Sequence, residues 1–282
     1  MLHLYDVGIS MPQPVTAFLR HSLALKTAMT DCLDQPTPKA VHWLRASTRR
    51  IEATLALLVD TADVPSLPKR SRKFRKSLRR IRRAASKVRD LDVHNELLAA
   101  YKNMSDATEL EKKLSSSRES SVKKLQQIIQ KDQDEIHRNL DKIEAILAPA
   151  TDLALSGGSL AHVAQTSLAP TLRGLNPQDD DDLHSIRKAC KNARYVAEIG
   201  SETSKVASRL AKRLHGVQKT TGDWHDCLLL LNEAQAFLPN GSPLTVKLHA
   251  KTGSLRRQAE SKAAYLLATK RQKPPLRAPD VH

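Results

Sequence analysis

Apolar residues recur every three to four positions over most of the chain, which is the spacing of helices that bury one face. No stretch alternates apolar and polar residues as a half-buried strand does. The pattern therefore predicts an all-α protein, with helices over 15–33, 38–60, 69–89, 91–102, 106–147, 160–172, 182–200, 204–221, 223–237 and 244–270.

Proline, glycine and capping residues set the predicted boundaries. Thr37 is a predicted N-cap, Gly222 a predicted turn, and Asp179–Asp182 an acidic run suited to a helix N-terminus. We expect an irregular N-terminus over 1–13, a first bundle over 14–150, a second over 151–271 and a disordered tail over 272–282.

The polar face of Val41–Glu52 (VHWLRASTRRIE) is the most informative pattern in the chain. On a helix, its His42, Arg45 and Arg49 share one arc, opposite an apolar stripe of Val41, Leu44, Thr48, Ile51, Leu55 and Leu58. Leu183–Arg194 (LHSIRKACKNAR) repeats this geometry, with one face formed by His184, Arg187, Lys191 and Arg194 and the other by Leu183, Ile186 and Cys190. The repeat predicts an internal duplication: two helical bundles related by approximate twofold pseudo-symmetry.

The segment 69–89 carries twelve Lys or Arg residues and no acid. A helical stripe still runs through it, formed by Phe74, Leu78, Ile81, Ala85 and Val88. The opposite arc holds Arg72, Arg75, Lys76, Arg79, Arg82 and Arg83. In the duplicated order Asp90 corresponds to Asp226, and we interpret Arg89–Asp90 and His225–Asp226 as structural pairings at helix ends.

The formal net charge of +16 predicts a polyanionic partner such as nucleic acid, an anionic membrane or a phosphate polymer. Aromatic residues make up only 3% of the chain, and binders of single-stranded nucleic acid usually add aromatic stacking platforms. The composition therefore favours inorganic polyphosphate over single strands, while binding to the backbone of a nucleic-acid duplex remains open.

Four segments of the chain resemble the CHAD family, the conserved-histidine α-helical domain: VHWLRASTRR, LHSIRKACKNARYVAE, RDLDV and GDWHDCLLL. The likeness runs from about residue 14 to 270. It implies two four-helix bundles around a basic groove or pore that binds inorganic polyphosphate, and association with polyphosphate granules and other proteins on them. The residues expected to bind polyphosphate are His42, Arg45, Arg49, Arg50, Arg72, Arg75, Lys76, Arg79, Arg82, Arg83, His184, Arg187, Lys188, Lys191, Arg194, Arg209, Lys212, Arg213 and Lys219.

The two copies are not equal in charge. Arg50 corresponds to Asn192, and Glu52 corresponds to Arg194. The basic segment 69–89 adds further charge to the first copy.

The sequence offers little for catalysis. It has no Gly-rich phosphate loop followed by Lys-Ser/Thr, no HExxH motif and no acidic cluster suited to Mg²⁺. An ExExK match at Glu109–Lys113 falls in a helical stretch, whereas that motif acts on a strand. We therefore expect a binding module with no catalytic residue, no metal and no cofactor. A phosphate-transferring enzyme that uses His42 and His184 is the third alternative.

Three scattered cysteines favour a reducing compartment. No secretory signal and no membrane span are visible, so we expect a cytoplasmic protein on polyphosphate granules.

Overall fold

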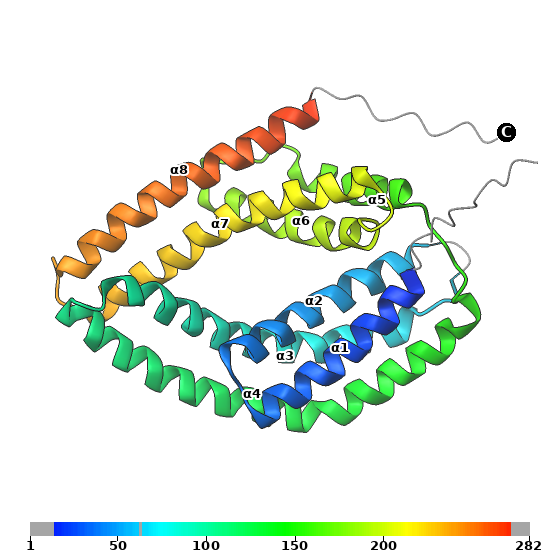
Figure 1. Cartoon of the computed structure of the whole chain (residues 1–282), viewed down its shortest axis with the longest axis horizontal. Helices are drawn as coiled ribbons and strands as arrows, with labels where there is room; N and C mark the ends of the chain where they lie inside the picture. The colour runs from blue at the N-terminus through cyan, green and yellow to red at the C-terminus, as the bar shows by residue number, and fades with distance from the viewer. Residues whose placement is uncertain (1–13, 62–63, 272–282) are drawn as a thin grey trace, which may run out of the picture. The chain divides into compact units, whose positions relative to one another are not determined.

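The computed structural model describes residues 14–61 and 64–271, without the side chains of 68–73 and 269–271. Helices make up nearly all of this part of the chain, and it contains no strand (Figure 1). The α-helices are α1 (Pro14–Asp34), α2 (Pro38–Val59), α3 (Pro68–Leu98), α4 (Ser105–Leu147), α5 (Gly157–Leu172), α6 (Asp180–Ile199), α7 (Lys205–Phe237) and α8 (Pro243–Arg271). Short 3₁₀ turns follow α3 and α4, at Ala99–Tyr101 and Ala148–Ala150. The predicted all-α fold is confirmed.

The chain divides into two compact units. Unit 1 comprises Met1–Val163 and Tyr195–Ala211, and unit 2 comprises Ala164–Arg194 and Lys212–His282. Helices α5, α6 and α7 each contribute residues to both units. The twofold pseudo-symmetry and the bundle boundaries at 14–150 and 151–271 stay predictions. The predicted irregular N-terminus and disordered tail lie outside the described residues.

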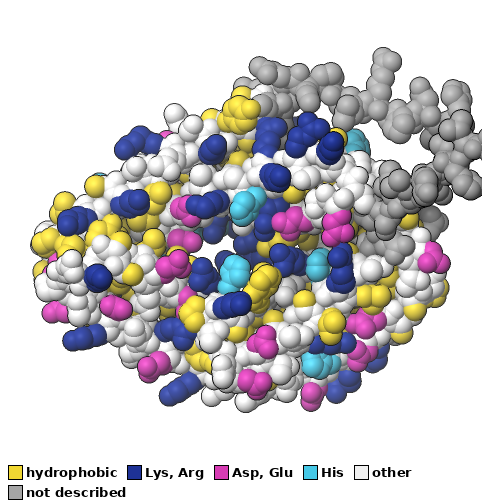
Figure 2. All heavy atoms as spheres, in the orientation of Figure 1, with side chains coloured by type: hydrophobic (Ala, Val, Ile, Leu, Met, Phe, Trp, Pro, Cys, Tyr) yellow, Lys and Arg dark blue, Asp and Glu magenta, His cyan; other side chains and the backbone are white. Residues whose placement is uncertain are grey.

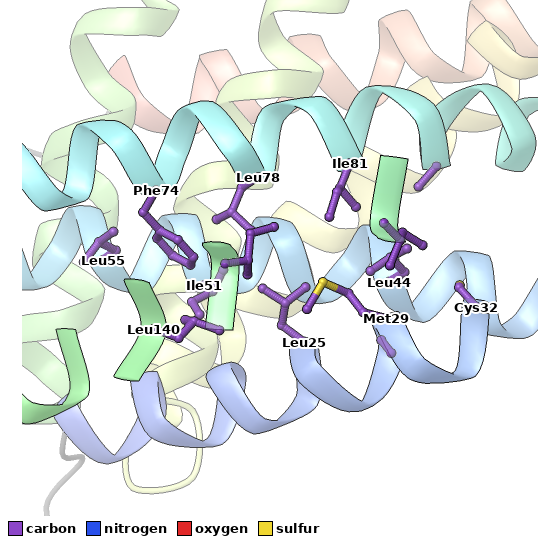
Figure 3. Close-up of a cluster of buried hydrophobic side chains, with 14 of the residues drawn as sticks. Leu25, Met29, Cys32, Leu44, Ile51, Leu55, Phe74, Leu78, Ile81 and Leu140 are labelled. Atoms are coloured by element: carbon purple, nitrogen blue, oxygen red, sulfur yellow. The ribbon is translucent and has the colours of Figure 1, made fainter. Parts of the chain in front are cut away.

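Unit 1 contains a four-helix bundle in which α1 packs on α2 and α4, and α3 packs on α2 and α4. Figure 3 shows its core, where Leu25 and Met29 of α1 meet Leu44 and Ile51 of α2 and Phe74 of α3. Both predicted apolar stripes, on α2 and on α3, are buried throughout. Leu23 of α1 lies outside this core and is 68% exposed.

Unit 2 is held by contacts between α7 and α8 and by the start of α6. The buried Thr252 hydroxyl of α8 donates a hydrogen bond to Cys227 Sγ of α7 at 3.3 Å. The N-terminus of α6 is capped as predicted, because the Asp182 backbone N–H donates to Asp179 Oδ1 at 2.9 Å. Thr37 caps α2 in the same way, by accepting from the Ala40 N–H at 3.2 Å.

Two predicted helix breaks are wrong. The segments 69–89 and 91–102 belong mainly to the single helix α3, which runs on to Leu98. The segments 204–221 and 223–237 form the single helix α7, with Gly222 in its interior. Asp90 and Asp226 are therefore interior residues of α3 and α7, so the interpretation of Arg89–Asp90 and His225–Asp226 as helix-end pairings is wrong.

Burial explains why α3 continues past the acidic pair that follows Arg89. Asp92 is 6% exposed, and its carboxylate accepts a hydrogen bond from Arg118 Nε of α4. A second guanidinium nitrogen of Arg118 donates to the Pro36 carbonyl oxygen at 2.9 Å. The buried carboxylate of Asp92 is thus paired with a guanidinium inside the bundle.

Candidate functional site

Two groups of mainly basic side chains, one in each unit, contain eight of the nineteen predicted binding residues. Lys and Arg side chains cover much of the face drawn in Figure 2, with histidines among them. We call the first group the α2/α3 cluster, formed by His42, Arg45, Arg49, Arg82 and Arg83. We call the second the α6/α7 cluster, formed by His184, Arg187, Lys188, His225 and Asp226.

Helices α2 and α3 position the first cluster through side-chain contacts between them. Arg45 Nε donates a hydrogen bond to Ser86 Oγ at 3.0 Å. Arg82 forms a close ion pair with Glu52, and both side chains are mostly buried. Arg45 and Arg82 are thereby fixed near each other, while His42 and Arg83 remain exposed.

The pKa of Arg82 shows that this cluster is crowded with positive charge. Burial lowers that pKa, and the neighbouring guanidiniums of Arg83 and Arg45 lower it further. Like charges held together in a half-buried site raise the free energy of the unliganded protein. A bound polyanion would remove that cost.

The second cluster has a stacked pair of imidazoles at its centre. The rings of His184 on α6 and His225 on α7 lie 5.2 Å apart between centroids, with 24° between their planes. Burial lowers the pKa of His184, and the positive charges of Lys188, His225 and Arg187 lower it further. Only Asp181 acts in the opposite direction.

The second cluster also contains one acid, Asp226 of α7. Asp226 Oδ1 lies 3.8 Å from Arg187 Nη2 and 3.6 Å from His225 Nδ1. This carboxylate offsets part of the cluster's positive charge and holds Arg187 toward α7.

Gly222 gives Arg187 its place against α7. A Cβ atom added at this buried glycine would lie 3.6 Å from both Nε and Nη2 of Arg187. The missing side chain therefore leaves room for the guanidinium to lie along the helix. A larger residue would displace it.

The remaining predicted residues lie outside these two sets of contacts. Arg75 is half-buried, and Lys76 and Arg79 are exposed on α3, whereas the side chain of Arg72 is outside the described residues. In unit 2, Lys191 is only 8% exposed, and Arg194 Nη1 lies 3.4 Å from His215 Nδ1.

Three of the four predicted residues on α7 form separate local contacts. Arg209 Nε donates to the Lys205 carbonyl oxygen, and Lys219 pairs with Asp223 at 3.0 Å. The guanidinium of Arg213 lies 5.5 Å from the ring of Tyr265 on α8, and Lys212 is exposed. Arg50 lies over the ring of Trp43, at 5.7 Å from its centroid.

Sequence reasoning did not assign Ser86, His225 or Asp226 to the site. The signal for the last two was present in GDWHDCLLL, but the wrong break at Gly222 placed them at a helix end. Nothing in the local pattern marks Ser86, since its partner Arg45 is 41 residues away.

Comparison with known proteins decides the family. The CHAD domain model matches residues 16–235. The chain belongs to the CHAD family. This family is associated in general terms with polyphosphate binding and is generally a binding module.

Two solved structures share the CHAD fold of this chain. The crystal structure of the CHAD domain from the plant Ricinus communis has a TM-score of 0.67 and 16% identity, over 93% of this chain and 91% of that one. PptA from Streptomyces chartreusis has a TM-score of 0.60 and 19% identity, over 93% of this chain and 100% of that one. No curated protein matches the chain.

The described helices contain neither a candidate membrane span nor a candidate metal site. None of them combines the length and apolar character needed to cross a bilayer. Within residues 14–61 and 64–271, no group of three or more His, Cys, Asp or Glu side chains is arranged to hold a metal ion.

Proposed function

We propose that this CHAD protein binds inorganic polyphosphate through the α2/α3 and α6/α7 clusters, together with the flanking basic residues of α3, α6 and α7. We further propose that this binding places it on polyphosphate granules in the cytoplasm, without catalysis. The observation that carries the proposal is the crowding of like charges in both units. The pKa of Arg82 in one cluster and of His184 in the other are both lowered, in part by neighbouring positive groups.

The chemistry of the side chains fits a chain of phosphates. Arginine offers a planar fork of donors to phosphate oxygens, lysine offers a mobile charge, and each neutralised phosphate releases counterions. His42 and His184 add N–H donors that phosphate favours in the protonated form. A uniform polymer needs many such contacts and no recognition of bases.

The first experiment measures binding of long-chain polyphosphate at several salt concentrations, with duplex DNA as competitor. The test variant changes Arg45, Arg49, Arg187 and Lys191 to Ala. Because each removed charge-assisted contact is worth about 1.5–3 kcal/mol, we expect the affinity to fall by at least about a hundredfold. The slope of affinity against salt should decrease by about one for each lost contact.

A matched control removes the same charge elsewhere. Lys112, Lys123, Lys124 and Lys131 are exposed on α4, and their change to Ala should alter affinity by less than about threefold. Thermal unfolding checks that both variants fold, since Lys191 is buried. Equal losses in the two variants, or displacement by DNA at equal phosphate concentration, would mean that the clusters act only as generic positive charge.

The same samples test the alternatives. Duplex DNA that binds more tightly than polyphosphate would favour the nucleic-acid function. Release of phosphate or shorter chains, with Mg²⁺ added and dependent on His42 or His184, would favour the enzyme.

A further inference from the structure

An open groove between α1 and α2 of unit 1 is not explained by polyphosphate binding. It has a volume of about 390 Å³ and is lined by Arg20, Leu23, Ala24, Thr27, Ala28, Asp31, Trp43 and Ser47. That volume lies within the range of pockets that take one small molecule. Its ends carry opposite charges, Arg20 at one and Asp31 at the other.

An exposed tryptophan forms one wall of this groove. Trp43 is 46% exposed although most large apolar side chains of unit 1 are buried. Its ring lies near two cationic or polar groups, with Arg50 over it at 5.7 Å and the edge of His42 at 6.0 Å. An exposed indole beside an arginine is the arrangement that stacks a nucleobase and holds its phosphate.

Two arginines lie at or near the groove: Arg20 lines it, and Arg50 lies over the ring of Trp43. Arg20 and Arg50 both lower the pKa of His21, so both guanidiniums lie within electrostatic reach of that ring. Arg20 forms an ion pair with Glu202 at 3.7 Å, but the two side chains are 61% and 74% exposed. Such a pair is weak in water, so Arg20 can turn to a phosphate group.

The negative end suits the edge of a base. Asp31 is exposed, and an ionised carboxylate only accepts hydrogen bonds. It therefore pairs with N–H groups, and guanine presents two adjacent ones whereas adenine presents an amino group alone. Arg20 and Asp31 are eleven positions apart on α1, so their Cα atoms lie roughly 16 Å apart along the helix. That distance is close to the length of an extended nucleoside diphosphate.

We propose that the α1/α2 groove binds a purine nucleoside diphosphate or triphosphate, with its base on Trp43, its N–H edge at Asp31 and its phosphates at Arg20 and Arg50. This site is separate from the polyphosphate proposal in its aromatic wall and its acid. Polyphosphate has no base, so it gains nothing from Trp43 or Asp31.

Intrinsic fluorescence tests the site directly, because the chain has two tryptophans and Trp224 is only 2% exposed. We expect GDP, and more weakly ADP, to quench the exposed Trp43 in the intact protein, and calorimetry to give the same affinities. Guanosine and inorganic diphosphate, which each lack half of the contacts, should bind at least about tenfold more weakly than GDP.

Three variants assign the contacts. Because stacking of a base is worth several-fold or more in affinity, Trp43→Ala should weaken GDP binding about tenfold by calorimetry. Arg20→Ala should weaken GDP but not guanosine, and Asp31→Asn should remove the preference for GDP over ADP. All three side chains are substantially exposed, and Lys131→Ala on α4 is the matched surface control.

The result also separates this site from the polyphosphate function. The variant with Arg45, Arg49, Arg187 and Lys191 changed to Ala should keep its GDP affinity. Inorganic diphosphate that binds as tightly as GDP, or GDP binding that is lost in that variant and kept in Trp43→Ala, would overturn the proposal. So would a fluorescence signal unchanged by millimolar nucleotide, or one that changes only with protein concentration as copies associate.

Discussion

The α2/α3 and α6/α7 clusters begin from the same His-x-x-Arg pattern but hold their charges in different ways. In the first, Arg45 is fixed by a neutral hydroxyl, Ser86, and the acid Glu52 pairs with Arg82. In the second, Arg187 is held by Asp226, and His184 stacks on a second histidine. The first cluster holds one histidine, His42, among four arginines, whereas the second holds a stacked pair of histidines with fewer permanent charges.

The difference shows that a repeated motif specifies which side chains share a face, but not how strongly they are charged. That depends on the helix packed against the motif. Helix α3 brings arginines toward α2, whereas α7 brings an acid and a histidine toward α6. We therefore expect pH to change phosphate binding by the first cluster less than it changes binding by the second.

The largest expected effect concerns His21, a neutral histidine beneath the arginines of unit 1. Its Nδ1–H donates to Thr54 Oγ1 at 2.9 Å, since the Thr54 hydroxyl itself donates to the Arg50 carbonyl oxygen. Burial, Arg50 and Arg20 lower its pKa to about 4. The folded pKa is below the unfolded one, so stability is full above pH 6.5 and falls as the pH approaches 4, by about 3 kcal/mol.

Chemical denaturation at pH 7 and pH 4 measures this loss. In His21→Gln, whose amide can still donate to Thr54, the unfolding free energy should fall between pH 7 and pH 4 by about 3 kcal/mol less than in the wild type. Carboxylates that titrate in the same range affect both proteins equally, so the difference isolates the histidine. Parallel decreases would show that His21 is solvated in the folded protein.

The next effect tests how Arg187 is held. At Gly222 an added Cβ would meet Arg187 at ordinary contact distance, so Gly222→Ala should fit. It should raise the unfolding free energy by about 0.5–1 kcal/mol, because glycine costs that much in a helix interior. Polyphosphate affinity should change by less than about twofold.

Gly222→Leu at the same position should push the guanidinium away and weaken polyphosphate binding by about tenfold, the loss of about one charge-assisted contact. Binding and thermal melts of the two variants give the comparison. Equal affinity in both would mean that Arg187 does not contact the polymer.

Gly222 also marks the limit of prediction from sequence. Periodicity identified the stripes of α2 and α3 correctly, because burial follows the local pattern of apolar residues. It failed at Gly222. A glycine at this point in the sequence predicts a turn, but in the structure Gly222 lies inside α7 and makes room for Arg187 of another helix. Periodicity also could not identify Asp92 as a buried residue, because its partner Arg118 lies 26 residues further along the chain.

A smaller effect follows from neutralising the acid in each cluster. Asp226→Asn and Glu52→Gln each free an arginine for phosphate, so both should tighten polyphosphate binding by about threefold. Their stabilities should differ, because the Glu52–Arg82 pair is close and mostly buried whereas Asp226 is 3.8 Å from Arg187. We expect Glu52→Gln to lower the unfolding free energy by about 1 kcal/mol or more, and Asp226→Asn to lower it less. Weaker binding in either variant would show that the acid orients its arginine for the ligand.

The smallest effect distinguishes the clusters by pH. The pKa of His184 is lowered in the free protein by burial and by Lys188, His225 and Arg187, so the ring is mainly neutral at pH 7. A bound phosphate chain favours the protonated ring, so binding takes up a proton and should tighten by about two- to threefold between pH 8 and pH 6.

The stability of the free protein depends on pH in the opposite sense. Because the pKa of His184 is lowered by folding, its contribution to the unfolding free energy falls as the pH decreases below 6.5. His184→Asn, which keeps a donor but cannot titrate, should bind with less pH dependence. His42→Asn, at an exposed position, should reduce the pH dependence less. If the two variants reduce the pH dependence equally, titration belongs to both copies of the motif, and the contrast between the two clusters does not hold.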